Sequence, residues 1–210
     1  MTQAPEMARP AGGPPPGATG QGGPPDLGAI AQRYLEGHVS GVENREHEFA
    51  LGIQMVINTI RDTVPYKHEM NDALVKAWLL SIQFAKDRGI LAEFCQKDLE
   101  TMAPVNARMA QLIAATGEKE LALESVAGYS PCHYHLVLET WKEPGKRIFR
   151  SPFKTVLEAS RAVGQFDLTE QYIHENWFVP RNHGFAEQLG VKFDISPWQE
   201  DGMITVALAS

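Results

Sequence analysis

The sequence contains few cysteines, no excess of basic residues and no long apolar run. Its two cysteines, Cys95 and Cys132, lie far apart, so no disulfide framework is expected and a reducing compartment is the default. The net charge of -7 argues against a nucleic-acid or anionic-membrane surface, because such a surface clusters Lys and Arg against phosphates. No apolar run approaches the roughly 20 residues that span a bilayer, and no secretion signal is evident. We therefore expect a cytoplasmic protein that binds neither nucleic acid nor membrane.

The N-terminal segment, residues 1–25, has an unusual composition. It contains seven Pro and six Gly with almost no large apolar side chain. Such a segment cannot bury enough surface to offset its conformational entropy, so we expect a disordered arm. Two roles are open for this arm. It either solubilises the protein or docks in extended form on a partner or a neighbouring subunit.

Residues 26–127 have the apolar spacing of helices. Asp26 is placed to cap a first helix that ends near His38, and 40–43 has the form of a capping box that opens a second. Since apolar residues recur at spacings of three and four, the second helix is predicted to pack one face against its neighbours. The residues of that face are Phe49, Ile53, Val56, Ile57 and Ile60.

Three further helices are predicted in this region. The first runs over about 68–88 and ends at Gly89, which can adopt the left-handed cap conformation. The second covers about 91–102. Pro104 suits the first turn of a separate helix that ends near Gly117. These helices predict an N-terminal helical bundle.

Residues 128–210 combine strands with helices. A strand over 132–141 and a short return strand at 147–149 flank a Pro-Gly turn. Two helices are then expected, from 151 to Gly164 and from 167 to Pro180, which ends or kinks the second. A last helical turn reaches Leu189, and alternating apolar residues predict a terminal hairpin around the loop 197–202. The prediction is an α+β fold in which a small antiparallel sheet is covered by helices and packs with the bundle as one unit.

The strand over 132–141 carries the strongest chemical pattern in the chain. Because successive strand residues point to opposite faces, His133, His135 and Glu139 share one face. Two imidazoles and a carboxylate can bind a divalent metal (Zn, Fe or Mn), with His174 or His183 completing the shell. In catalysis, His135 would move protons and Glu139 would act as the base. The alternative is a solvated strand face on which Glu139 pairs with a nearby Lys or Arg.

The same stretch resembles part of the first cupin motif, in which a Gly precedes His-x-His, a Glu and a second Gly. The matching residues are Gly128, His133, His135, Glu139 and Gly145, with both glycine spacings one residue short. The second cupin motif is absent, and the helices predicted over 152–189 do not suit a β-barrel. The resemblance therefore implies a metal-binding pattern and not the cupin fold.

The C-terminal region resembles in layout the 4-vinyl-reductase-like and aminothiazoline-carboxylate-hydrolase-like domains. The matching residues are Trp177, Gly184-Phe185-Ala186, Leu189-Gly190 and 191–195. Such domains bind small organic molecules between sheet and helices, and some hydrolyse them. The resemblance implies a pocket between the C-terminal sheet and the helix over 168–189.

Four residues are candidates for lining that pocket: Tyr172, Trp177, Phe178 and His183. A plain hydrophobic core is the alternative for the aromatic residues among them. Two functions remain open. The first is a small-molecule-binding protein or metal-assisted enzyme, performing hydrolysis or oxygen chemistry. The second is a non-catalytic adaptor subunit of a homo- or hetero-oligomer, which docks through the helical half and the Pro/Gly arm.

Overall fold

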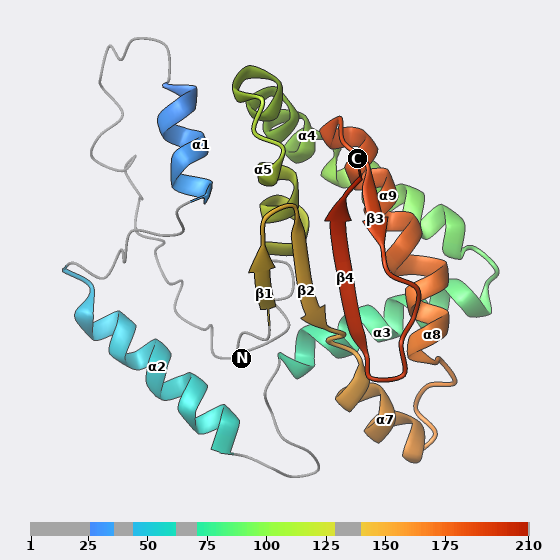
Figure 1. The fold of residues 1–210 in the computed structure, drawn as a ribbon. Coiled ribbons are helices and arrows are strands. Elements are labelled where there is room, and N and C mark those ends of the chain that lie inside the picture. The colour runs from blue at the N-terminus through green and yellow to red at the C-terminus, as the bar shows by residue number, and fades with distance from the viewer. Residues whose placement is uncertain (1–25, 36–43, 62–70, 129–139, 210) are drawn as a thin grey trace, which may run out of the picture.

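The computed structural model describes residues 26–35, 44–61, 71–128 and 140–209. The fold is α+β, as predicted, with helices around one four-stranded antiparallel sheet (Figure 1). The N-terminal arm, the capping box at 40–43 and most of the strand predicted over 132–141 lie outside the described residues. The helices are α1 (Leu27–Leu35), α2 (Glu46–Arg61), α3 (Asp72–Asp87), α4 (Leu91–Thr116), α5 (Glu120–Leu123), α7 (Lys154–Ala162), α8 (Glu170–Ile173) and α9 (Val179–Leu189).

The sheet has the strand order β1-β2-β4-β3. Its strands are β1 (Thr140–Glu143), β2 (Lys146–Arg150), β3 (Phe193–Ile195) and β4 (Met203–Leu208). Both predicted hairpins form. In the first, Trp141 pairs with Ile148 across a turn where Gly145 has a φ of 70°, a conformation that suits glycine. In the second, Ile195 pairs with Val206, and the central pair β2–β4 joins the two hairpins into one sheet.

Two hydrophobic clusters hold the helices to the sheet and to one another. In the first, the sheet residues Phe149 and Val206 pack with Leu112 of α4 and Leu189 of α9. The second lies among α3, α4, α7 and the 173–178 region, where Val75, Leu79, Ile82, Val156, Leu157 and Trp177 are buried. Both clusters join residues from the two halves of the chain.

Several local predictions agree with the structure. The Asp26 side chain accepts a hydrogen bond from the Ala29 amide at 3.1 Å and so caps α1. Gly89 follows α3 and Gly117 ends α4, with φ values of 67° and 72°. A side-chain cap missing from the predictions begins α8, where the Thr169 hydroxyl accepts from the Tyr172 amide.

The prediction of a separate helix at Pro104 was wrong, because α4 runs unbroken from Leu91 to Thr116 with Pro104 inside it. Proline removes one backbone hydrogen bond from a helix, so packing against other elements must offset the lost stability. Gln188 of α9 contacts α4 on both sides of the proline. Its side chain donates to the Leu99 carbonyl at 3.0 Å and accepts from the Asn106 amide group at 2.7 Å.

The helix predicted from 167 continues past Pro180 to Leu189. A π-helical turn, His174–Phe178, joins α8 to α9, and the Val179 amide donates to the His174 carbonyl. This wider turn ends just before Pro180. A second π turn, Glu124–Gly128, follows α5, and neither π turn was predicted.

The prediction that α2 packs its apolar stripe against neighbours was also wrong. We call the residues Phe49, Ile53, Val56, Ile57 and Ile60 the α2 apolar face. No residue of α2 is buried, and the helix makes no more than marginal contact with the other described helices and strands. Amphipathic spacing predicts which face is apolar, but it does not say that the same chain supplies what covers that face.

A buried ion-pair network lies where the described chain stops at 128 and resumes at 140. Arg147 of β2 is 4% exposed and donates to Glu124 at 2.6 Å and to Glu120 at 2.9 Å. Lys142 of β1 also binds Glu124, at 2.8 Å. The network therefore ties the chain before 129–139 to the chain after it.

Candidate functional site

The residues predicted to form a metal and catalytic centre fall in two groups. His133, His135 and Glu139 lie outside the described residues, so their roles as metal ligands and catalytic groups stay a prediction. His174 is described, and so are the four predicted ligand-binding residues. Across the described ranges, no group of three or more His, Cys, Asp or Glu side chains is arranged to hold a metal ion.

His174 lies in the first π-helical position after α8 and is 3% exposed. Its Nε2 lies 2.9 Å from the Ser196 carbonyl oxygen. Because a carbonyl oxygen only accepts, Nε2 carries the proton and Nδ1 is the acceptor. Burial lowers the pKa of the His174 imidazole, which favours this neutral form. The ring also stacks on Phe178, with centroids 5.5 Å apart.

A small cavity lies beside His174, with Ser151 and Glu170 as its other polar lining residues, and we call it the polar cavity although most of its wall is apolar. Burial raises the pKa of the Glu170 carboxyl, while a hydrogen bond to the Ser151 hydroxyl opposes that shift. His174 Nδ1 and Glu170 Oε1 are buried and have no hydrogen-bond partner among the described residues. The cavity volume is about 10 Å³, which is the size of one water molecule and excludes an organic ligand.

The predicted aromatic residues do not line one pocket. Trp177 is 2% exposed in the core, against Trp78 and Phe153, and the Arg181 guanidinium lies over its ring. It therefore occupies the hydrophobic core that was the alternative for this residue. Phe178 borders the small cavity beside His174, and Tyr172 borders a different hollow.

The hollow beside Tyr172 has a volume of about 390 Å³ and lies between α4 and the 172–180 segment. Cys95 is in its wall. Burial raises the pKa of the Cys95 thiol, so the reactive thiolate is disfavoured at neutral pH. The sulfur therefore acts as a packing group and not as a nucleophile in this hollow.

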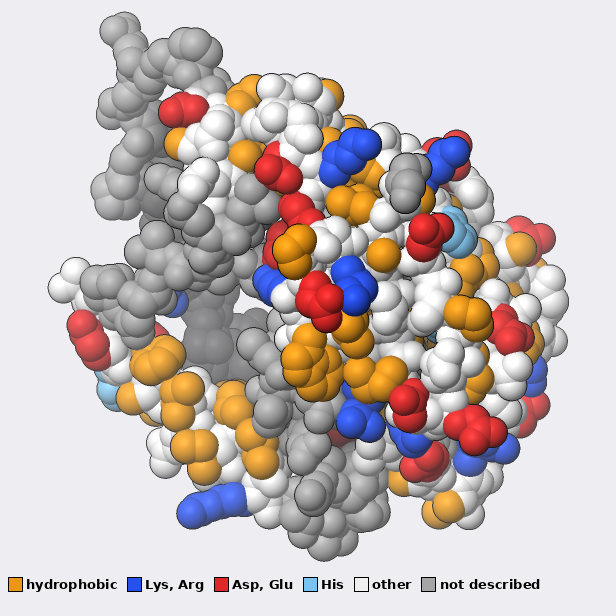
Figure 2. Space-filling view, viewed as in Figure 1, with side chains coloured by type: hydrophobic (Ala, Val, Ile, Leu, Met, Phe, Trp, Pro, Cys, Tyr) orange, Lys and Arg blue, Asp and Glu red, His pale blue; other side chains and the backbone are white. Residues whose placement is uncertain are grey.

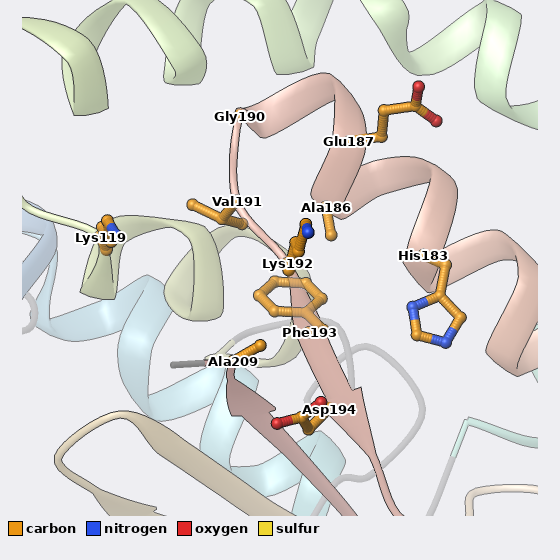
Figure 3. Close-up of a pocket in the computed structure, with 10 residues that line it drawn as sticks. All are labelled: Lys119, His183, Ala186, Glu187, Gly190, Val191, Lys192, Phe193, Asp194 and Ala209. Atoms are coloured by element: carbon orange, nitrogen blue, oxygen red, sulfur yellow. The ribbon is translucent and has the colours of Figure 1, made fainter.

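A larger open hollow lies between α9 and β3, and we call it the α9–β3 hollow (Figure 3). Its volume is about 790 Å³. His183 is the one predicted ligand-binding residue in its wall, and Figure 3 shows this imidazole on α9, across the hollow from β3. The wall is Lys119, His183, Ala186, Glu187, Gly190, Val191, Lys192, Phe193, Asp194 and Ala209.

The charged groups of this hollow were not predicted. Lys119 precedes α5, while Lys192 and Asp194 belong to the β3 region, so only the fold brings them together. All three side chains are exposed, and their spacing along the chain carries no signal of a shared site. The mixture of two ammonium groups, carboxylates and apolar patches can hold a polar organic molecule.

The α2 apolar face is largely exposed. Figure 2 shows hydrophobic side chains exposed along α2. Phe49 is 56% exposed, Ile53 45% and Ile57 47%, while Val56 and Ile60 are half-buried. Acidic residues, Glu46 and Glu48, stand at the start of the helix, and Arg61 stands at its end.

Comparisons with known proteins give no relative for this chain. No family model, no curated protein and no solved structure matches it. Among the described helices, none combines the length and the apolar character that crossing a bilayer requires. A functional argument therefore rests on the α2 apolar face, the α9–β3 hollow and the polar cavity beside His174.

Proposed function

We propose that this protein is a non-catalytic assembly subunit, which joins another protein chain through the α2 apolar face. One observation carries the proposal: a 16-residue helix presents five large apolar residues on one face and buries none of its residues. An isolated helix of this length is marginal in water, because most helical stability in proteins comes from packing of the apolar face. A contiguous exposed apolar surface on a soluble protein marks an interaction site.

The composition of the helix also supports a protein partner over a lipid surface. Helices that lie on membranes carry Lys and Arg along the polar face. In α2 the only basic residue other than His47 is Arg61, and two acidic residues occupy the first turn. The overall net charge of -7 opposes binding to an anionic bilayer as well.

The test is the size of the assembly that the full chain forms in concentrated extracts of cells that produce it. We expect the tagged wild-type chain to elute well above its own 23.2 kDa and Ile53→Asp to elute at monomer size. Met55→Asp is the matched control, because Met55 is 71% exposed but lies off the apolar face of the same helix. A wild-type chain that elutes as a monomer, or an Ile53→Asp chain that keeps the wild-type size, contradicts the proposal.

The α9–β3 hollow supports a second candidate, small-molecule binding. Its volume of about 790 Å³ lies within the range of ligand pockets, and His183 and two lysines offer donors to an anionic or polar ligand. A metal held by His133, His135 and Glu139 would add hydrolytic or oxygen chemistry to this candidate.

A screen of polar metabolites by thermal shift tests the second candidate. A ligand of this hollow is expected to raise the melting temperature of the wild type but much less that of Lys192→Glu or His183→Ala. Lys97→Ala is the control, because Lys97 is exposed on α4 and pairs only with Glu100 there. If every stabilising compound acts equally on the wild type and on both hollow variants, this candidate fails.

A further inference from the structure

We propose that the partner of α2 is the α2 helix of a second copy of this chain, and that the two helices pair antiparallel. This inference rests on the proposed function and names its partner. It is carried by the spacing of the apolar residues and by the placement of charge along the helix.

The apolar spacing has the form of a two-helix seam. Phe49, Ile53, Val56 and Ile60 follow at intervals of four, three and four, which places them on one stripe of a helix with 3.6 residues per turn. Alternation of three and four is the pattern of the a and d positions of a coiled coil. Ile57 widens the stripe on one side.

The stripe is also symmetric about its own centre, which lies between Gln54 and Met55. Phe49 and Ile60 are equally far from that point, and so are Ile53 and Val56. A two-fold axis at the centre therefore brings Phe49 of one copy onto Ile60 of the other, and Ile53 onto Val56. A two-fold interface requires such a self-complementary surface, and an antiparallel pair of α2 helices has it.

The charges distinguish antiparallel from parallel pairing. Glu46 and Arg61 lie on the same flank of the apolar stripe, at opposite ends of the helix. In an antiparallel pair the matching flanks meet, so each Glu46 approaches Arg61 of the other copy. A parallel pair would place like charges near each other at both ends and would align the two helix dipoles, which is unfavourable.

Glu46 is already partly engaged within its own chain. One carboxylate oxygen, Oε1, accepts from the Asn44 amide at 3.1 Å. The second oxygen is available to a guanidinium from the other copy. Arg61 is exposed at the helix end, so neither group has to leave a buried partner to form the pair.

The size of the surface sets the expected affinity. Stable dimers bury about 1,200–2,000 Å² in total, and two short helices that share four seam positions each bury less than this. The dimer is therefore expected to dissociate on the order of micromolar concentration. The pairing then depends on the concentration of the protein.

The experiment measures the molar mass of the purified full chain by light scattering over a concentration series. The wild type is expected to rise from 23.2 kDa toward twice that mass, while Ile53→Asp stays monomeric and Met55→Asp follows the wild type. Leu80→Asp removes an exposed apolar residue of α3, another surface that α2 could meet, and is expected to dimerise normally. The thermal midpoint of each variant shows that its core is folded.

A charge exchange tests the orientation. Arg61→Glu is expected to weaken dimerisation about fivefold, because it replaces exposed attraction by repulsion at both ends of the pair. The double variant Glu46→Lys/Arg61→Glu restores opposite charges across an antiparallel pair, so its affinity is expected to return toward the wild type. In a parallel pair like charges meet in the wild type and in both variants, so Arg61→Glu would not weaken the dimer and the double variant would have nothing to restore.

Three results overturn the inference. A wild type that stays monomeric at every concentration excludes the second copy as the partner, while the assembly in cell extracts can still depend on Ile53 and leave the proposed function standing. Loss of the dimer in Leu80→Asp, or its persistence in Ile53→Asp, assigns the interface to another surface. Failure of the charge exchange to restore affinity excludes the antiparallel arrangement.

Discussion

Replacement of Glu124 by alanine tests the buried network at the ends of the 129–139 segment. Glu124 is 3% exposed and accepts from the Arg147 guanidinium at 2.6 Å. Its removal therefore takes one of the neutralising carboxylates away from the buried Arg147 cation. Breaking a buried ion pair costs about 3–5 kcal/mol. Arg147 keeps Glu120 at 2.9 Å and two backbone carbonyls, which places the expected loss at about 3 kcal/mol.

Urea unfolding of the full chain measures this loss. With a slope of about 2 kcal/mol per molar, a loss of about 3 kcal/mol moves the midpoint down by about 1.5 M. Lys142 also loses its ion pair with Glu124, but this side chain is 47% exposed and water replaces the carboxylate. The Glu124→Gln variant keeps the shape of the side chain, so any loss that persists in it comes from the missing charge.

A double variant tests whether the stability lost in Glu124→Ala comes from the buried charge of Arg147. Because well-packed apolar residues can replace a buried ion pair at little cost, Glu124→Leu/Arg147→Met is expected to recover most of the stability. A shift of less than about 1 kcal/mol in the free energy of unfolding of Glu124→Ala would show that the buried ion pair contributes little. A double variant less stable than Glu124→Ala would show that the buried Arg147 charge is not the source of the loss.

Three further predictions concern the helix packing, the polar cavity and the metal. Gly184→Ala should destabilise the fold by about 1–3 kcal/mol in urea, since its Cβ would lie 2.4 Å from Leu99 Cδ1, and added Leu99→Ala should recover part of the loss. Burial raises the pKa of Glu170 above its ordinary value of about 4.5, so the fold loses stability as the pH rises above that ordinary value. Glu170→Gln should therefore be more stable than the wild type at pH 7, and the difference should vanish below about pH 4.5. The metal site of the second candidate requires near-stoichiometric divalent metal in protein purified without added metal and none in folded His133→Ala/His135→Ala, so metal analysis tests it and a metal-free wild type contradicts it.

Features set by neighbouring residues were predictable from the sequence. The Asp26 cap, the left-handed Gly89 and the turn at Gly145 each follow from one side chain or from its absence. The terminal hairpin followed from alternation of apolar residues, which needs no knowledge of the partner strand. The α+β class follows from these local elements taken in order.

Features set by contacts across the chain were not predictable. Pro104 favours the start of a helix, yet α4 continues through it. The contact that accompanies this continuous helix is with Gln188, 84 residues further along the chain. The π turn that ends in Phe178 likewise has no signal in the spacing of apolar residues. In both places the local preference of proline yields to the packing of α4 on α9.

The candidate sites divide in the same way. Aromatic spacing could not tell whether Trp177 lines a pocket or fills the core, because both environments need a large apolar ring. The α9–β3 hollow is formed by residues from distant parts of the chain, of which only His183 was a candidate beforehand.

The α2 apolar face is the opposite case, because the sequence predicts the face fully and the structure leaves it uncovered. Its stripe at 49, 53, 56 and 60 is as regular as the buried stripe of α3, where Val75, Leu79 and Ile82 are fully enclosed. The hydrophobic pattern of a helix is the same whether the surface that covers its apolar face belongs to the same chain or to another. A regular stripe that the described part of its own chain leaves exposed is therefore evidence for an intermolecular contact. The symmetry of the α2 stripe about its centre is what favours an identical partner over an unrelated one.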